Sequence, residues 1–288
     1  CIDFTGGRSF VVKFDKTVDV EAVKGSLSQV FKNEKGESSS IDIKTFGNDQ
    51  QLKITTDYKI GDESLKADQE IDQKLYQGLK NQLPANLTFE EFKSAAENPI
   101  GIVSSTKVGP TVADDIKMGG ALAVLGSLLG IFAYILLRFR RWQFSLGAII
   151  GLAFDATIIL GAFSLFHSVM PFNMEINQDF IAAILTVLGY SINDTVIIFD
   201  RIRENLKDGR ERTLAQLFND SISGTLGRTI NTSLTVLLVV LAIFIFGGEN
   251  LKGFMFALLL GVISGTFSTI FVSSLLAFDF FKGKKIEK

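Results

Sequence analysis

Five long apolar segments constrain the fold of this chain more than any other feature. A helix that crosses the hydrocarbon core of a bilayer needs roughly 20 consecutive, mostly apolar residues. Five segments of the 288-residue chain satisfy this requirement: about 119–137, 144–166, 180–199, 229–248 and 253–281. Buried helices of soluble proteins are usually shorter, and five in a row would leave little surface for water. The sequence therefore predicts an α-helical membrane bundle over residues 119–281.

The basic residues of this region predict its orientation, because short cytoplasmic loops retain Lys and Arg. They lie between the first and second segments, between the third and fourth, and in the tail 282–288: Arg138, Arg140 and Arg141; Arg201, Arg203, Lys207, Arg210 and Arg212; Lys282, Lys284, Lys285 and Lys288. The alternate loops, 167–179 and 249–252, contain the single Lys252. This asymmetry places the C-terminus in the cytoplasm and residues 1–118 outside it.

Residues 1–118 have the pattern of a small α+β domain. Polar and apolar residues alternate as in half-buried strands over 8–14, 41–47 and 51–57, with a last strand near 100–107. Helices are expected over Asp19–Phe31, with Asp19 as N-cap, and over about 70–82 and 89–97. A hairpin turn is expected at Asn48-Asp49. The β-α-β-β order predicts a ferredoxin-like domain.

Several classes of function are not favoured by the residues present. The net charge of −2 gives no indication of nucleic-acid binding. The lone Cys1 excludes an intramolecular disulfide and a cysteine-based metal site. The 1–118 domain has no nucleophile beside a base and no phosphate loop, and Asp3 in the run Asp3–Gly7 is expected to cap a turn rather than to catalyse. We expect no enzyme activity, no cofactor and no metal.

Two charged residues in the apolar segments suggest a site inside the bilayer. A charge at mid-bilayer costs about 2.5–3.5 kcal/mol on insertion scales, so each one requires a reason. Asp194 has Tyr190 one turn before it and Asn193 beside it. Arg228 begins the next segment and is followed by a polar stripe: Asn231, Thr232 and Thr235. A pair between Asp194 and Arg228 would form a switch that a proton opens; alternatively, Asp194 only packs and Arg228 extends to the interface.

Other polar and small residues of the segments allow less specific interpretations. Asp155 has no local partner, so it must face another helix or water, and both a structural and a functional role remain open. His167, at the outer end of its segment, is expected to be solvated. The glycine pairs Gly126/Gly130, Gly147/Gly151 and Gly261/Gly265 predict close packing of helices.

The chain resembles the SecF family in motifs distributed over nearly its whole length. They are Ile2-Asp3-Phe4-Thr5-Gly6-Gly7, Val108-Gly109-Pro110, Gly189-Tyr190-Ser191-Ile192-Asn193-Asp194, Arg201-Ile202-Arg203-Glu204-Asn205, Arg228-Thr229 with Thr232-Ser233, and Phe246-Gly247-Gly248 with Gly253-Phe254. The resemblance implies an RND-like bundle of six spans, of which the first would precede Cys1, and pairing with SecD, either separate or fused to this chain.

The same resemblance implies a function and a site. It suggests a subunit in the bacterial inner membrane that uses a proton or sodium gradient to assist export of a preprotein through SecYEG, with YidC as a further partner. Asp194 and Arg228 would be the ion-coupling acid and its basic partner, with Asn193 beside them. Asp155 matches the Asp of a His-Asp pair in the family, but Phe154 replaces the His, which weakens a proton-relay role there.

Two other functions compete with this interpretation. One is half of an RND-type small-molecule efflux transporter, although those have much larger outer domains than residues 1–118. The other is an assembly scaffold whose polar residues only pack helices. The dependence of secretion on an ion gradient, compared with drug susceptibility, would distinguish the three.

Labelling of single cysteines tests the predicted orientation in a Cys1→Ser background. Cysteines at positions 60 and 170 should react with an impermeant reagent from the outer side, and those at 140, 208 and 286 from the cytoplasmic side, because the basic loops stay inside. Labelling of position 208 from the outer side would contradict both the orientation and the resemblance to SecF.

Overall fold

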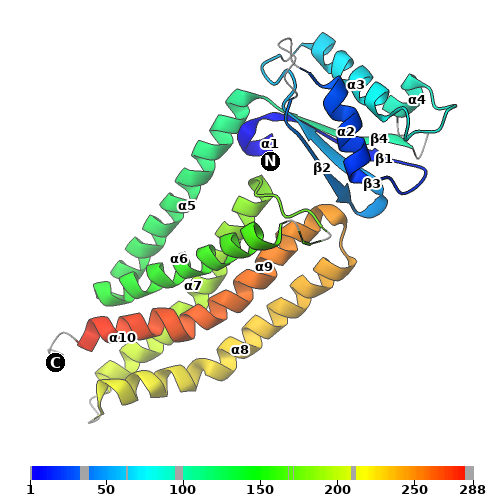
Figure 1. Cartoon of the computed structure of the whole chain (residues 1–288). Coiled ribbons are helices and arrows are strands. Elements are labelled where there is room, and N and C mark those ends of the chain that lie inside the picture. Colours follow the sequence, from blue (N-terminus) through cyan, green and yellow to red (C-terminus); the bar gives the residue numbers. More distant parts are fainter. Residues whose placement is uncertain are drawn as a thin grey trace. The chain divides into compact units, whose positions relative to one another are not determined.

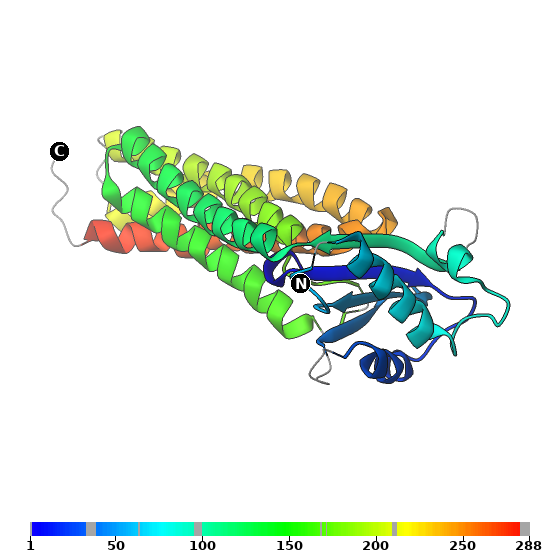
Figure 2. The same ribbon diagram turned by 90° about the horizontal axis from the view of Figure 1, so that it is seen from above.

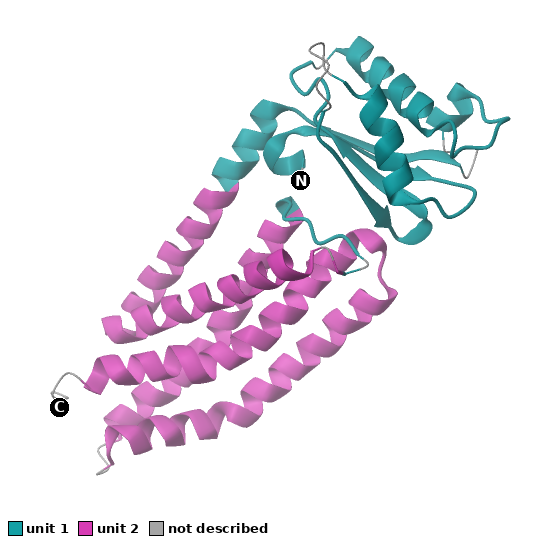
Figure 3. Cartoon of the chain, in the orientation of Figure 1, with its two compact units in different colours: residues 1–119, 170–178 teal, residues 120–169, 179–288 magenta. Residues whose placement is uncertain are grey.

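The chain divides into two compact units. The computed structural model describes residues 2–32, 39–62, 64–94, 100–167, 169–170, 172–208 and 212–282. The first unit, here the α+β unit, comprises Cys1–Gly119 and Met170–Gln178, and the second, the helical unit, comprises Gly120–Val169 and Asp179–Lys288 (Figure 3). Cys1, Arg210, the end of the helix expected over 89–97, and the tail after Lys282 lie outside the described residues.

The α+β unit is built on one antiparallel sheet of four strands. These are β1 (Gly7–Lys13), β2 (Ile41–Phe46), β3 (Asn48–Thr56) and β4 (Gly101–Val108), in the order β2-β3-β1-β4. Its helices are α1 (Ile2–Thr5), α2 (Val20–Val30), α3 (Leu65–Leu79) and α4 (Phe89–Lys93) (Figure 1). With α2 between β1 and β2, and α3 and α4 between β3 and β4, the order is that of a ferredoxin-like domain, as predicted.

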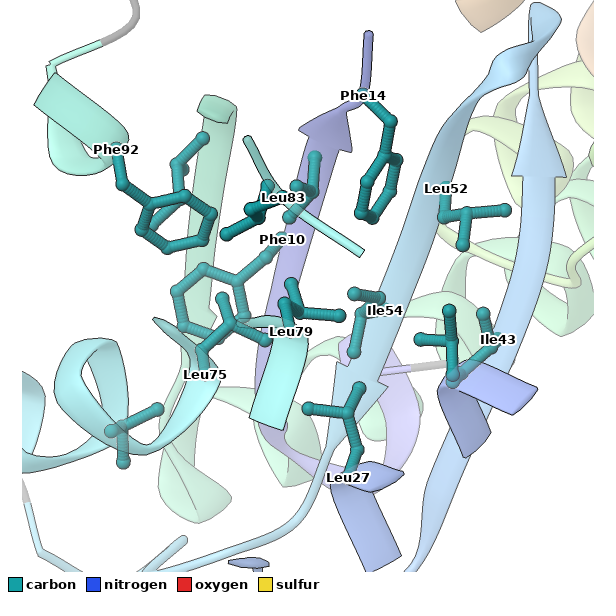
Figure 4. Close-up of a cluster of buried hydrophobic side chains, with 14 of the residues drawn as sticks. Phe10, Phe14, Leu27, Ile43, Leu52, Ile54, Leu75, Leu79, Leu83 and Phe92 are labelled. Atoms are coloured by element: carbon teal, nitrogen blue, oxygen red, sulfur yellow. The ribbon is translucent and has the colours of Figure 1, made fainter. Parts of the chain in front are cut away.

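Alternation along the strands creates the core of this unit. Phe10 and Val12 on β1 and Leu52 and Ile54 on β3 are fully or almost fully buried, because alternate residues of a strand point to the same face. Side chains of the helices complete this cluster, including Leu27, Leu75 and Leu79 (Figure 4). Asp19 is the N-cap of α2, as predicted, and accepts a hydrogen bond from the backbone N–H of Glu21 at 3.2 Å.

Two local features differ from the predictions. The β2–β3 turn lies at Gly47, with φ +80°, and not at Asn48-Asp49. Glycine adopts this left-handed conformation without steric cost, whereas Asn48 already belongs to β3. The run around Asp3 forms a short helix, α1, that Gly6 ends at φ +74°. The Asp3 carboxylate accepts a hydrogen bond from the backbone N–H of Gln178 at 3.0 Å.

The segment Met170–Gln178 belongs to the α+β unit although it joins two helices of the other unit. Lys53 on β3 donates to the Glu175 carboxylate at 2.9 Å, and both side chains are largely buried. Phe172 and Met174 are also buried. An ion pair with little solvent access is costly to break from one side, so this contact fixes the segment to β3.

A second ion pair holds α3 and the preceding loop against β1. Arg8 is 3% exposed and donates to the Asp68 carboxylate at 2.7 and 3.0 Å. Its remaining donors reach the carbonyls of Tyr58, Lys59 and Asp62 at 2.8–3.3 Å. The planar fork of Arg8 therefore satisfies groups on both the loop and the helix.

Replacement of Arg8 tests this network. Arg8→Met leaves the carbonyls and the Asp68 carboxylate without their donor, and we expect a loss of about 3 kcal/mol in the free energy of unfolding. Lys107→Met is the matched control, because Lys107 also binds Asp68 but is more exposed, so a loss of about 0.5 kcal/mol is expected. Hydrogen exchange of β1 in the full chain measures both.

The same pair predicts an acid dependence. Partial burial favours the neutral carboxyl of Asp68, but hydrogen bonds from Arg8 and Lys107 outweigh it and hold its pKa below the ordinary value of 3.8. A lowered pKa in the folded state contributes stability above pH 3.8 that is lost as the pH falls through the folded-state pKa. Arg8→Met should therefore lose less stability than wild type on acidification below pH 3.8; an identical loss would contradict this assignment.

The five long helices predicted from hydropathy are present, which confirms the fold class. They are α5 (Pro110–Phe139), α6 (Trp142–Phe166), α7 (Gln178–Lys207), α8 (Leu214–Phe246) and a last span, Glu249–Lys282, that comprises α9 (Glu249–Ser268), the π-helix η1 (Thr269–Ser273) and α10 (Ser274–Lys282) (Figures 1 and 2). The chain is a multi-pass membrane protein. Large apolar side chains such as Leu129, Leu137 and Phe246 are exposed on these helices, as lipid contact requires.

Two of the three predicted glycine pairs pack against other helices. A Cβ on Gly147 would lie 2.8 Å from the Ser273 carbonyl, and one on Gly151 would overlap the Ser273 hydroxyl. On α9, a Cβ on Gly261 would overlap Val187 of α7, and one on Gly265 would lie 3.0 Å from Ser191. By contrast, Gly126 and Gly130 on α5 face open space among the described residues.

This difference predicts opposite effects of the same substitution. Gly261→Ala forces a methyl group into Val187 and should lower the free energy of unfolding by about 1–3 kcal/mol. The matched control, Gly126→Ala, adds a methyl group in open space and should be neutral or slightly stabilising, since alanine favours helix. Thermal unfolding of the full chain in detergent compares them, and equal midpoints would contradict the packing at Gly261.

Candidate functional site

Asp194 lies in the interior of the helical unit. Asp194 is 2% exposed, and its Oδ2 accepts a hydrogen bond from Ser233 of α8 at 3.4 Å. Ser233 itself accepts from Thr266 of α9 at 2.7 Å and from the Tyr190 hydroxyl at 3.4 Å. One neutral hydroxyl group therefore bonds to the carboxylate, two more bond to that hydroxyl, and helices α7, α8 and α9 meet there.

Arg228 does not form the expected ion pair with Asp194. Arg228 is exposed, and within the described part of the chain no contact of ion-pair length joins its side chain to Asp194. Arg228 is still near enough to attract the carboxylate electrostatically. The reason is that Arg228 lies on the outward-facing side of α8. Arg228, Asn231 and Thr235 are all exposed on α8, whereas Thr229 and Ser233 are buried. Ser233, and not the polar stripe that follows Arg228, faces Asp194.

Asn193 also lies apart from the buried cluster. It is exposed on α7, while its neighbour Asp194 is buried, because successive residues of a helix point in different directions. Asn193 and Arg228 are thus accessible to lipid or to another polypeptide, and Asp194 is accessible to neither without a movement of α7 or α8.

Asp155 forms a second polar centre in the same unit. It is fully buried on α6, and its Oδ2 accepts a hydrogen bond from Ser191 of α7 at 2.7 Å. Ser264 and Ser268 of α9 lie near this carboxylate, and their hydroxyl groups donate to the carbonyls of Gly261 and Gly265 on their own helix. Phe154, which stands where the resemblance leads one to expect a histidine, stacks on Phe267 at 6.3 Å between ring centroids. The structure thus gives Asp155 the interhelical partner that its own helix lacks.

Five hydroxyl residues of these centres were not predicted as site residues: Ser191, Ser233, Ser264, Thr266 and Ser268. Ser191 lies three residues before Asp194, and Ser233 lies five after Arg228, so both were visible in the motifs. Neither could be assigned to a carboxylate without knowing which faces of α7 and α8 are turned inward. No group of three or more His, Cys, Asp or Glu that could hold a metal ion occurs among the residues the structure describes.

Comparison with known proteins places the chain in a family. Residues 88–283 match the family described as protein export membrane protein SecD/SecF, C-terminal, and residues 2–18 match the SecD/SecF GG motif. The chain belongs to the SecF family. Protein translocase subunit SecF of Rhodothermus marinus is 40% identical over 274 residues, which cover 95% of this chain and 80% of the relative.

Other members of the family support this assignment. SecF of Pseudomonas aeruginosa is 34% identical over 275 residues, covering 96% of this chain and 79% of its own length. The crystal structure of SecDF from Thermus thermophilus, described as a translocon-associated membrane protein, superposes with a TM-score of 0.75 at 31% identity and covers 98% of this chain. This chain spans 34% of that longer SecDF chain. The resemblance to SecF seen in the sequence motifs is thereby confirmed.

Proposed function

We propose that this chain is a SecF-type subunit of the protein-export machinery that couples a transmembrane proton or sodium gradient to preprotein translocation and release. It acts without enzyme chemistry of its own. The observation that carries the proposal is the environment of Asp194, which is 2% exposed inside a membrane bundle. Among the described residues, a neutral hydroxyl group is hydrogen-bonded to its carboxylate and no cation is. Such a group is costly in a bilayer, and intramembrane carboxylates are typical of ion pathways.

The coupling step follows from the separation of Asp194 and Arg228. A charged Asp194 attracts Arg228, and a neutralised Asp194 does not, so ion binding changes the force between α7 and α8. Ser233 holds the carboxylate when Arg228 is turned away. One charge that crosses 100 mV releases about 2.3 kcal/mol, which is comparable to the bias that shifts a two-state element.

The proposed partners and location follow from the family. The related structure is a SecDF chain and this chain spans a third of it, so a SecD bundle is the expected partner, and the exposed Asn193 and Arg228 are available to it. SecYEG, a preprotein and YidC complete the proposed assembly. The proposed location is the bacterial inner membrane, with residues 1–118 outside the cytoplasm and the C-terminus inside.

Substitution of Asp194 tests the coupling. Asp194→Asn preserves shape but removes the ionisable group, so in vesicles containing SecD and SecYEG it should abolish the stimulation of export by an imposed ion gradient. Arg228→Lys keeps the charge but loses the planar fork, and a partial loss is expected. Thr235→Ala is the matched control, since Thr235 is exposed on α8 and should leave export unchanged.

The test separates the competing functions. If Asp194→Asn exports at the wild-type rate under the gradient and drug susceptibility is unchanged, Asp194 only packs helices and the chain is a scaffold. If export is normal but drug susceptibility rises, the efflux alternative replaces the proposal. The variants must insert and copurify with SecD as wild type does, which distinguishes a coupling defect from misassembly.

A further inference from the structure

The helical unit contains a second buried carboxylate to which the coupling step gives no role. Asp155 has no exposed surface, and its Oδ2 accepts the hydrogen bond from Ser191. Its Oδ1 is equally buried and accepts no hydrogen bond from any residue that the structure describes. Buried polar atoms are normally satisfied by the protein, by ordered water or by an ion. An oxygen left free at this depth indicates a place for a ligand.

No cation of the described chain compensates this carboxylate. Its one hydrogen bond comes from the neutral hydroxyl of Ser191, and the nearby hydroxyls of Ser264 and Ser268 donate to the carbonyls of Gly261 and Gly265 at 3.3 and 3.2 Å. Asp194 of α7 is hydrogen-bonded to Ser233 of α8 instead. The charged residues of the last span lie at its two ends: Glu249 and Lys252, which pair with each other at 2.7 Å, and Asp279 and Lys282. A negative charge on Asp155 therefore has no counter-charge among the residues that the structure describes.

The surroundings of Asp155 are rich in small and hydroxyl-bearing residues. Gly265 brings α9 close to Ser191 and Asp155, since a Cβ there would lie 3.6 Å from Asp155 Oδ2. The π-helix η1 follows directly, and its Thr269 shares a hydrogen bond of 2.8 Å with Thr195 of α7. Single π-turns inside α-helices occur frequently at functional sites. Hydroxyl oxygens of α7 and α9 thus lie around the Asp155 carboxylate of α6.

We propose that Asp155, with the hydroxyl groups of Ser191, Ser264 and Ser268, binds a monovalent cation, H⁺ or Na⁺, at a site separate from Asp194. One carboxylate carries one negative charge, which one monovalent cation neutralises. Carboxylate and hydroxyl oxygens are donors suited to either ion, and transporters bind both at such positions between helices.

Occupancy of this site acts on the helix that also carries Asp194. Ser191 lies three residues before Asp194 on α7, and both side chains are buried, one facing α6 and the other α8. The binding of the ion does not depend on the proposed function; its consequence for export does. A binding measurement on the chain alone can therefore refute the Asp155 site without refuting the proposed function, and the export assay can refute the proposed function without refuting the site.

Two measurements on the full chain in liposomes test the site. Infrared difference spectroscopy during a pH titration detects protonation of a buried carboxyl group, and radioactive sodium at alkaline pH detects sodium binding. Asp155→Asn should eliminate either one buried-carboxyl band, if the ion is H⁺, or one bound sodium per chain, if it is Na⁺. Asp194→Asn should retain that signal, and the matched control Asp179→Asn, an exposed carboxylate on α7, should alter neither.

A milder variant protects the test against misfolding of Asp155→Asn. Ser191→Ala removes one hydroxyl group and keeps the carboxylate, so it should shift the frequency of the Asp155 band or weaken sodium binding by about tenfold, the effect of one lost hydrogen bond. If Asp155→Asn has the wild-type spectrum and the wild-type sodium binding, the proposal is wrong. Wild-type values for Ser191→Ala would contradict the role of that hydroxyl group and with it the proposed site.

Discussion

Every backbone polar group in the hydrocarbon core of a bilayer must find its partner within the protein, because no water is there to bind it. The long helices satisfy their own backbone groups, and lipid solvates exposed side chains such as Leu129. Burial of apolar surface therefore does little to hold one helix to another. Close approach at glycines and hydrogen bonds between hydroxyl groups do so instead. Gly261 against Val187 and Thr195 against Thr269 are such contacts.

Helix α7 is the element on which these contacts converge. Within one turn, Ser191 binds Asp155 of α6, Asp194 binds Ser233 of α8, and Thr195 binds Thr269 of η1. A change of charge at either carboxylate therefore alters a hydrogen bond that involves α7. The two acidic residues differ in their partners, because Asp155 is hydrogen-bonded to Ser191 of α7 and Asp194 to Ser233 of α8.

The chain itself links α7 to the α+β unit. The segment before α7 is bound to β3 by the pair Lys53–Glu175, and Asp3 accepts a hydrogen bond from Gln178, the first residue of the helix. The α+β unit is also continuous with α5, which begins two residues after β4 ends at Val108. A displacement of α7 therefore acts on a segment that is fastened to the sheet by a poorly solvated ion pair, whose rupture would cost several kcal/mol.

The sequence by itself determined the elements: apolar length predicts the five spans, alternation predicts the strands, and Asp19 predicts the start of α2, because each signal is local. It did not determine which face of an element is turned inward. Polar residues lie on both sides of α8, so packing against α7 and α9 had to select Ser233 over Arg228 as the neighbour of Asp194. Identical glycine pairs on α5 and α9 face open space in one case and Val187 and Ser191 in the other. Only the tertiary structure decides such contacts, since they join residues far apart in the chain and depend on the rotation of each helix about its axis.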